Sequence, residues 1–315
     1  MMSEFEASSS ANEGQKLGFP DLRDRICVRE PYFALQDLVD TGAGLRARVF
    51  VQQTPVDEVG PITMAEAGRH LAILGLCSVA RRQRSSERNY YLANRAQIQR
   101  IAGALAATKE ALSLTAEVTR MDRRSADAHT ALYLADGTKV LTLDVTYQIL
   151  SEPAFERIFA SHRRDLRHTE RVGEASADEL ASRAEPYRVP VRLEDVQLTE
   201  TTLQASLQTV TPAMCSGHFP HFPALPVAVV SQALATAAST LFTHRTGVAT
   251  NLVSRASTVA DALAFAGEPI EISATFLEST PRGEAYRTVA KTGAGLVIAE
   301  VTTYLEPHLD TQARG

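Results

Sequence analysis

The sequence predicts an α+β protein made of two similar halves, each with one long helix wrapped by a curved antiparallel sheet. The chain matches itself at one nearly constant offset, each half holds one long apolar helix, and the remaining regular segments alternate like strands. A sheet must cover its apolar face, and one helix per half is the only element available to do so.

The internal repeat is the strongest of these observations. "LQDLVDTGAGLRARV", from position 35, resembles "LEDVQLTETTLQASL", from position 193, an offset of 158 (193 − 35). Three further pairs follow in the same order: "LANRAQ" with "LVSRAS", "LSLTAEV" with "IEISATF", and "DGTKVLTLDVTY" with "TGAGLVIAEVTT". Their offsets are 160 (252 − 92), 158 (270 − 112) and 156 (292 − 136). The two halves are therefore predicted to share one fold.

Both halves show the same order of predicted elements. Alternating strands are expected first, at 45–52 and 203–210, and long apolar helices follow at 62–80 and 227–244. The closing strands are predicted at 90–98, 112–121 and 138–149 in the first half, and at 249–256, 268–278 and 296–305 in the second. The predicted domains are a disordered lead-in (1–18), an N-terminal unit (19–150), a charged helical linker (151–186), a C-terminal unit (187–307) and a tail (308–315).

Composition excludes several classes of function. The net charge of −5 argues against a nucleic-acid partner or an anionic membrane surface. The three cysteines are widely spaced, which argues against a disulfide framework or a metal site. Residues 224–242 carry no charge, but they include a proline, a glutamine and several hydroxyl side chains, so a core helix is expected rather than a membrane span. With no apolar signal segment at the start, the expected location is the cytoplasm.

One loop carries the clearest motif. "SGHFPHFPALPVAVVSQALA", from position 216, holds His218 in a proline-rich loop that leads directly into the second apolar helix. It resembles the signature of the hotdog-fold 3-hydroxyacyl-ACP dehydratases, the FabA/FabZ type, in which G-H-F-P and two further prolines precede a helix bearing Glu or Asp. The resemblance implies a fused double hotdog, with each site formed by a histidine from one half and a carboxylate from the other.

The resemblance implies one complete site and one degenerate site. Position 14 after His218, where the family has its acid, is Gln232, whereas Glu66-Ala67 in the first helix matches the acid followed by alanine. Counting 14 back from Glu66 gives Gln52 at the histidine position. The first half is also eight residues shorter there, with 19 positions from 47 to 66 against 27 from 205 to 232. His218 as base and Glu66 as acid would form the working site, and Gln52 and Gln232 the degenerate one.

Three more groups are expected to support that site. The backbone N–H of Val227, at the start of the second helix, suits a developing enolate oxygen, and Gly217 shapes the loop. His70 lies one turn after Glu66, where it either bonds the carboxylate or points away. Arg255 is a candidate contact for an acidic carrier protein. No metal or cofactor is expected beyond the phosphopantetheine that carries the substrate.

The predicted activity is dehydration of a 3-hydroxyacyl thioester to the enoyl thioester in fatty-acid or polyketide-type biosynthesis. A double-bond isomerase would use the same pair. The alternatives are a hotdog acyl thioesterase and a non-catalytic acyl-binding partner. The expected partner is an acyl carrier protein or a polyketide carrier domain, and a homodimer is compatible with the fold. The sequence decides neither acyl chain length, branching and stereochemistry nor the choice between carrier protein and CoA.

Overall fold

The computed structural model describes residues 15–16, 19–83, 87–101, 106–164, 187–207 and 209–308. The first half contains β1 (Gln15–Lys16), α1 (Phe19–Ile26), β2 (Gln36–Asp40), β3 (Leu45–Val49), α2 (Met64–Arg82), β4 (Asn89–Arg100), β5 (Leu112–Met121), β6 (Ser125–Tyr133), β7 (Lys139–Ser151) and α3 (Glu152–Ile158). The second contains β8 (Glu194–Leu198), β9 (Thr202–Leu207), β10 (Ala224–Leu225), α5 (Val227–Thr246), β11 (Asn251–Ala260), β12 (Ala264–Phe265), β13 (Ile270–Thr280), β14 (Gly283–Thr292) and β15 (Val297–Pro307).

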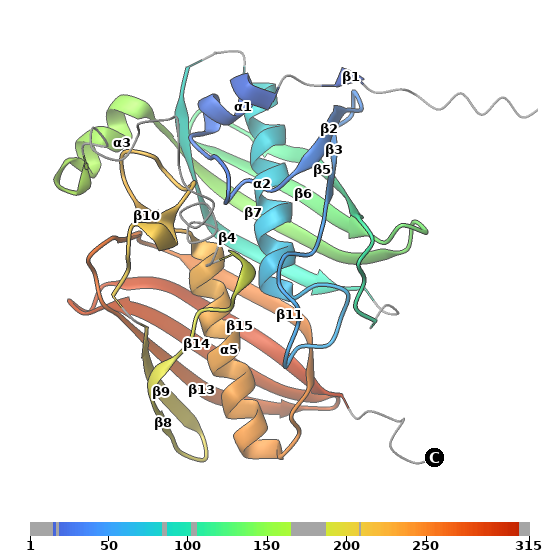
Figure 1. Cartoon of the computed structure of the whole chain (residues 1–315), viewed down its shortest axis with the longest axis vertical. Helices are drawn as coiled ribbons and strands as arrows, with labels where there is room; N and C mark the ends of the chain where they lie inside the picture. Colours follow the sequence, from blue (N-terminus) through green and yellow to red (C-terminus); the bar gives the residue numbers. More distant parts are fainter. Residues whose placement is uncertain are drawn as a thin grey trace, which may run out of the picture.

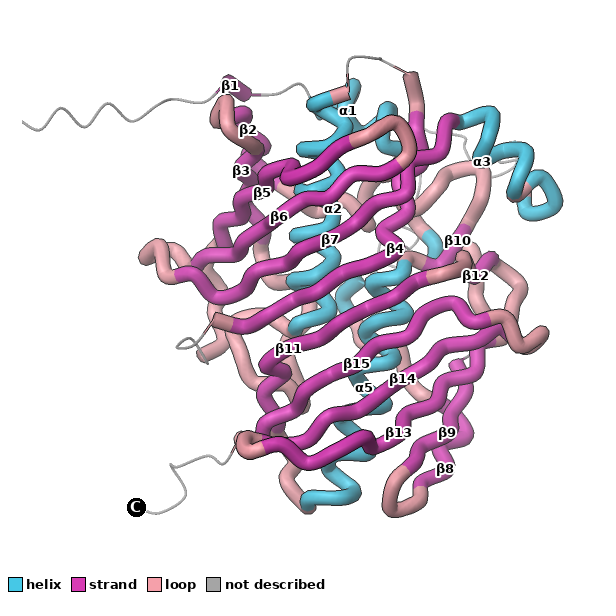
Figure 2. Tube along the Cα trace, turned by 180° about the vertical axis from the view of Figure 1, so that it is seen from behind, coloured by secondary structure: helices cyan, strands magenta, loops and turns pink. Residues whose placement is uncertain are grey.

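Thirteen of these strands form one continuous antiparallel sheet, in the order β1-β2-β3-β5-β6-β7-β4-β11-β15-β14-β13-β9-β8. The halves meet where β4 pairs with β11, with Gln97 opposite Ser257. Both long helices lie on the same face of this sheet (Figure 1), and the view from behind shows the strands running across them (Figure 2). This is the predicted double-hotdog architecture.

The sequence explains why α2 and α5 lie in the core. Fourteen side chains of α2 and ten of α5 are buried, and they fall on more than one face of each helix. Thr63 caps α2 by accepting the Glu66 N–H, and Gly247 ends α5 in the left-handed conformation that glycine adopts readily. By length and composition α5 could cross a membrane, but in this chain it packs on β13, β14 and β15, which confirms the core-helix prediction.

Seven of the fifteen strands in the described residues were not predicted: β1, β2, β6, β8, β10, β12 and β14. Five of them have only two or five residues, which is too short for a clear alternation, whereas β6 is rich in alanine and polar residues and β14, which begins at Gly283, does not alternate strictly. Of the predicted disordered lead-in, Gln15 and Lys16 form β1 on β2, while 1–14 and 17–18 lie outside the described residues. In the predicted linker, α3 and the turn Ala160–His162 are helical, 165–186 lie outside the described residues, and residues 309–315 of the tail do too.

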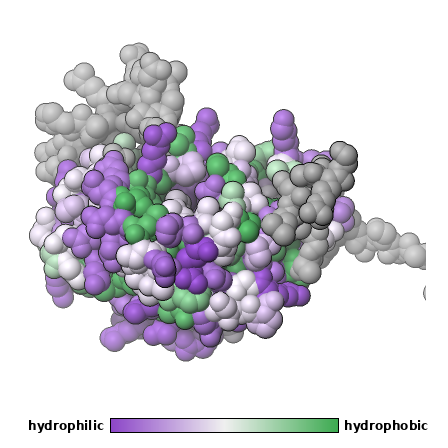
Figure 3. All heavy atoms as spheres, turned by 90° about the horizontal axis from the view of Figure 1, so that it is seen from below, coloured by the Kyte–Doolittle hydropathy of each residue, from purple (hydrophilic) through white to green (hydrophobic). Residues whose placement is uncertain are grey.

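The face of the molecule that is seen from below is mainly polar (Figure 3). In the space-filling view from below, hydrophilic residues predominate and hydrophobic residues occur in small groups (Figure 3). The buried apolar side chains instead form one large cluster that spans both halves and includes residues of α2, α5 and the sheet. The core therefore ties the halves together.

Candidate functional site

The backbone of the histidine loop is fixed by close packing. Gly217 has φ +79°, and a Cβ placed there would lie 2.3 Å from the Arg29 carbonyl oxygen. The Arg29 N–H donates to the Gly217 carbonyl at 2.8 Å, and Val28 forms a bridge to His218. Only glycine combines this left-handed conformation with so close an approach. The N-terminal segment of the chain thus holds the loop of the second half in place.

The imidazole of His218 has a defined orientation. Its Nδ1 lies 2.9 Å from the Ala224 carbonyl oxygen, which can only accept, so Nδ1 carries the proton and Nε2 keeps a free lone pair. The ring stacks on Phe219 at 3.9 Å and meets the edge of Tyr32 at 5.1 Å between centroids. Burial lowers the pKa of His218 to about 4, against the opposing hydrogen bond to Ala224. His218 is therefore a neutral, oriented base at pH 7.

His218 lines a cavity of about 240 Å³ at the junction of the halves, here called the His218 cavity. Tyr32 and Leu76 contribute from the first half, and Val227 and Leu225 from the second. Val227 is the first residue of α5, where the backbone N–H groups of a helix have no intrahelical acceptor. An oriented base and an N–H suited to a developing oxyanion therefore share one cavity.

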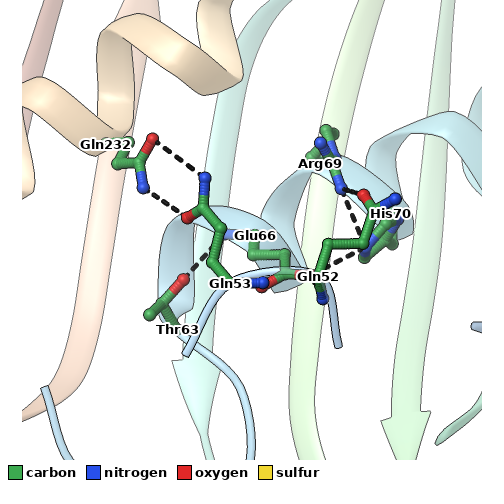
Figure 4. Close-up of polar contacts among 7 residues, drawn as sticks. All are labelled: Gln52, Gln53, Thr63, Glu66, Arg69, His70 and Gln232. Carbon is green, nitrogen blue, oxygen red and sulfur yellow. Dashed lines mark hydrogen bonds and ion pairs between the residues drawn. The ribbon is translucent and has the colours of Figure 1, made fainter. Parts of the chain in front are cut away.

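Glu66 does not lie in this cavity. Its Oε1 accepts the Gln52 N–H at 2.6 Å and its Oε2 accepts the Gln53 N–H at 3.2 Å (Figure 4). His70 Nε2 lies 3.4 Å from Oε1, and the carboxylate lines only a small separate cavity. Both carboxylate oxygens thus accept backbone N–H groups and hold the loop at Gln52 and Gln53 in place. The expected contact between Glu66 and His218 does not form among the described residues.

His70 lies against Glu66 rather than pointing away, with Nε2 3.4 Å from Oε1, but a nitrogen that accepts from Arg69 cannot also donate to this carboxylate. Burial, followed by the charge of Arg69, lowers the pKa of His70 to about 4. Arg69 Nη2 lies 3.2 Å from His70 Nε2 and also donates to Gln52 Oε1. Glu66, Arg69 and His70 thus form one buried cluster, seen in Figure 4 beside the start of α2.

The register of the two helices explains why Glu66 is not the partner of His218. Gln232 is five residues after Val227, the start of α5, and five residues after Met64, the start of α2, stands Arg69. Between the helices lies a cavity of about 110 Å³, here called the central cavity. The residues of α2 and α5 that line it are also related by an offset of 163 (227 − 64). The central cavity is lined by matching positions of both helices: Met64 and Val227, Ala65 and Ala228, Gly68 and Ser231, and Ala72 and Ala235. The residue of the first half that matches Gln232 is therefore Arg69.

The degenerate position also differs in detail from expectation. Gln53, rather than Gln52, reaches across to α5: the amides of Gln53 and Gln232 exchange two hydrogen bonds, one of them 3.4 Å from Gln53 Nε2 to Gln232 Oε1. Both residues line a third cavity of about 600 Å³, here called the Gln53 cavity. Its helix lining includes Ala235, Thr236 and Ser239, which match Ala72, Ile73 and Leu76 of the His218 cavity at the offset of 163. It is the counterpart of the His218 cavity in the other half.

Other candidates take no part in the His218 cavity. The guanidinium of Arg255 lies over the Tyr304 ring at 4.0 Å on the sheet. All three cysteines are buried and free, and burial raises the pKa of Cys215 to about 12, so its thiol is unreactive. Among the described residues no cluster of histidine, cysteine and carboxylate side chains could hold a metal ion. The sequence analysis did not predict Tyr32 and Arg69 as site residues, because no local motif contains them. Arg69 is identified only by aligning α2 with α5 from their first residues.

Comparison with known proteins extends the fold assignment. No protein-family model and no curated protein matches the sequence. Among solved structures, the chain resembles a tesB protein of Mycobacterium avium subspecies paratuberculosis, with TM-score 0.56 and 10% identity over 87% of this chain and 96% of that one. It also resembles acyl-CoA thioesterase II TesB2 of Mycobacterium marinum, with TM-score 0.53 and 12% identity over 87% and 97%. A hot dog fold protein of Alicyclobacillus acidocaldarius matches with TM-score 0.53 and 11% identity over 91% and 98%.

These likenesses establish the hotdog fold, but they correct the predicted activity. Of the three structures named above, TesB2 of Mycobacterium marinum is an acyl-CoA thioesterase, which is a hydrolase, and none of the three is named as a dehydratase of the FabA/FabZ type. The site agrees with this correction. Dehydration needs an acid opposite His218 to protonate the leaving hydroxyl, but the helix position that would supply it holds Arg69, whose guanidinium does not release a proton near neutral pH. The dehydratase prediction is wrong.

Proposed function

We propose that this chain is an enzyme that hydrolyses an acyl thioester, with the thioester bound in the His218 cavity. The observation that carries the proposal is the hydrogen bond from His218 Nδ1 to the Ala224 carbonyl, which leaves Nε2 as a base in a cavity that also receives the start of α5. The likeness to thioesterases over most of the chain supports the reaction class.

The proposed mechanism needs only groups that line this cavity. His218 Nε2 accepts a proton from water as the water oxygen attacks the thioester carbonyl carbon. The carbonyl oxygen gains the electron pair and becomes an oxyanion, which the Val227 N–H at the start of α5 stabilises. The tetrahedral intermediate then expels the thiolate, and the proton returns from His218 to sulfur or solvent. The products are a carboxylic acid and a free thiol, so no second protein acid is required.

The test is release of free thiol from acyl-CoA and acyl carrier protein substrates, followed with a thiol reagent. Replacing His218 with Ala should lower kcat by roughly 10²–10⁴-fold, the usual contribution of a general base. His221→Ala is the matched control, because His221 stands in the same loop but does not line the His218 cavity. Equal loss in both variants would contradict the assignment, and acyl binding without thiol release would indicate a non-catalytic acyl-binding protein. Comparing the two carriers also tests the expected carrier-protein partner.

A further inference from the structure

Arg69 is a buried cation with more donors than acceptors. Its side chain is 4% exposed and lines the central cavity. A guanidinium has five N–H donors, and the acceptors around Nη2 are Gln52 Oε1 and His70 Nε2. Its Nε is buried without a hydrogen-bond partner among the described residues. A buried donor without an acceptor is costly, so a ligand oxygen here would be bound strongly.

The nearby carboxylate does not satisfy this cation. Glu66 lies one turn earlier on α2, but its oxygens accept the Gln52 and Gln53 N–H groups, and in the described part of the chain Arg69 forms no ion pair with it. The guanidinium lies instead over the Tyr187 ring, 5.0 Å from its centroid. Burial lowers the pKa of Arg69 from its ordinary high value. Arginine nevertheless stays charged at neutral pH.

The central cavity adjoins the His218 cavity. Tyr32, Ala72 and Val227 line both, and Arg69 lines the central cavity. Most of the central cavity is lined by apolar side chains. A second polar group there, the hydroxyl of Thr303, is also buried without a partner among the described residues. Two residues that line this cavity thus carry an unsatisfied polar group, and a plain hydrocarbon chain could satisfy neither of them.

We propose that Arg69 binds an acceptor oxygen on the acyl chain, so that the preferred substrate is an acyl thioester bearing a keto or carboxylate oxygen rather than an unsubstituted fatty acyl group. This inference rests on the proposed function, because it places the thioester at His218 and Val227 and the rest of the chain toward Arg69. Arg69 is then a specificity-determining residue that contacts the substrate away from the reacting bond.

The kinetic test compares three six-carbon CoA thioesters that differ only in oxygen content: hexanoyl, 3-oxohexanoyl and adipoyl. The wild type should favour one of the oxygen-bearing substrates in kcat/KM, and which one it favours identifies the oxygen as keto or carboxylate. Arg69→Met should reduce that preference by about 10- to 100-fold, the usual effect of losing a hydrogen bond to a charged group, and Arg69→Lys should restore part of it. Gln52→Ala, which removes an acceptor but leaves the guanidinium, should keep the preference. A preference for hexanoyl, or one unchanged in Arg69→Met, overturns the inference.

A binding measurement separates this inference from the proposed function. Thioethers cannot be hydrolysed, so S-hexyl-CoA, S-(3-oxohexyl)-CoA and S-(5-carboxypentyl)-CoA report binding alone by titration calorimetry. The wild type should bind an oxygen-bearing thioether at least tenfold more tightly than S-hexyl-CoA, and Arg69→Met should lose that difference. If no thioester is cleaved but this pattern holds, the proposed hydrolysis is wrong and the role of Arg69 stands. Equal binding of all three thioethers by a folded wild type contradicts the role of Arg69. Circular dichroism of each variant establishes that it is folded.

Discussion

The His218 cavity and the Gln53 cavity occupy matching positions beside α2 and α5, yet their linings differ. Ile73 and Leu76 face the first, whereas Thr236 and Ser239 stand at the matching positions of the second. The first measures about 240 Å³ and contains His218; the second measures about 600 Å³ and contains no histidine. The two repeats of one fold therefore form different cavities. The first is smaller, more apolar and bears a histidine, and the second is larger and lined by hydroxyl groups.

The ionisable groups of the two cavities also differ in their pKa values. Burial lowers the pKa of His218 to about 4, so at pH 7 it is neutral and free to accept a proton. Glu58 lines the Gln53 cavity, and burial raises its pKa to about 7 despite the charge of Arg100. Glu58 accepts the Met64 N–H at 2.9 Å and pairs with Arg100 at 3.0 Å, so it supports the start of α2. Arg100 Nε in turn donates to the Val253 carbonyl of the second half at 3.1 Å, so Glu58 links the halves through Arg100. The comparison indicates that polar groups of the second cavity hold the halves together, through Arg100 and through the pair of Gln53 and Gln232.

The first way to break the comparison is to disturb the loop that only one half possesses. Gly217→Ala should reduce stability by about 2–5 kcal/mol, because alanine resists a positive φ and its Cβ would overlap the Arg29 carbonyl. Turnover should fall with it, since His218 follows directly. Gly247→Ala is the control: its φ is +72° but no atom lies within 4 Å, so only about 1–2 kcal/mol should be lost and turnover retained. Urea unfolding measures the stability of the two variants, and thiol release measures their turnover. Equal losses in the two variants would contradict the conclusion that close packing at Gly217 fixes the position of His218.

The second prediction fills one cavity at a time. Leu76→Trp should lower kcat/KM at least tenfold, because the added ring occupies space beside His218 that the substrate needs. Ser239→Leu gives the Gln53 cavity the residue of its counterpart, and turnover should stay within about twofold of the wild type. Thiol release under saturating and limiting substrate measures both. If Ser239→Leu were the more damaging change, the Gln53 cavity would be the working site.

The fold could be predicted because its signals are periodic and occur twice. Alternation, two apolar helices and a repeat near offset 158 all survive local variation, and the sheet needs both helices. Seven strands were missed, namely the short strands β1, β2, β8, β10 and β12 and the two without a clear alternation, β6 and β14. The repeat did not give the helix register, since the helices match at 163 while strands such as β5 and β13 match at 158 (270 − 112).

That small difference in offset misdirected the site assignment. Matching Glu66-Ala67 to the acid and alanine of the family signature set Glu66 against Gln232, whereas counting from the helix starts sets Arg69 there. The position of His218 could be predicted, because the glycine and prolines around it fix a loop locally. Its neighbours could not be, because Tyr32 approaches through tertiary packing alone. Sequence spacing is reliable within a loop and unreliable across an insertion.

The third prediction concerns the pH dependence of stability. His218 and His70 each have a pKa of about 4 in the folded chain and near 6.5 when unfolded, so the unfolded state binds more protons between these values. The free energy of unfolding should therefore fall as pH drops from 6.5 toward 4, by about 1.4 kcal/mol per pH unit for each histidine. His70→Gln should remove one of these contributions, as measured by urea unfolding at pH 7, 6 and 5. An unchanged slope in that variant would show that His70 is protonated in the folded state.

The fourth prediction concerns the amide pair that replaces catalytic groups at the Gln53 cavity. Gln232→Ala should cost about 1–3 kcal/mol, because the buried Gln53 amide loses its partner, while turnover stays within about twofold, since neither residue lines the His218 cavity. Replacing both Gln53 and Gln232 with leucine removes the two amides together and should cost less than about 1 kcal/mol. A double-mutant cycle of Gln53→Leu, Gln232→Leu and the double variant, measured by urea unfolding, gives the coupling between the halves as the non-additive part of the cost. Additive single costs would mean that the two amides do not pair, and a loss of turnover as large as that of His218→Ala in a folded Gln232→Ala variant would move the chemistry to the Gln53 cavity.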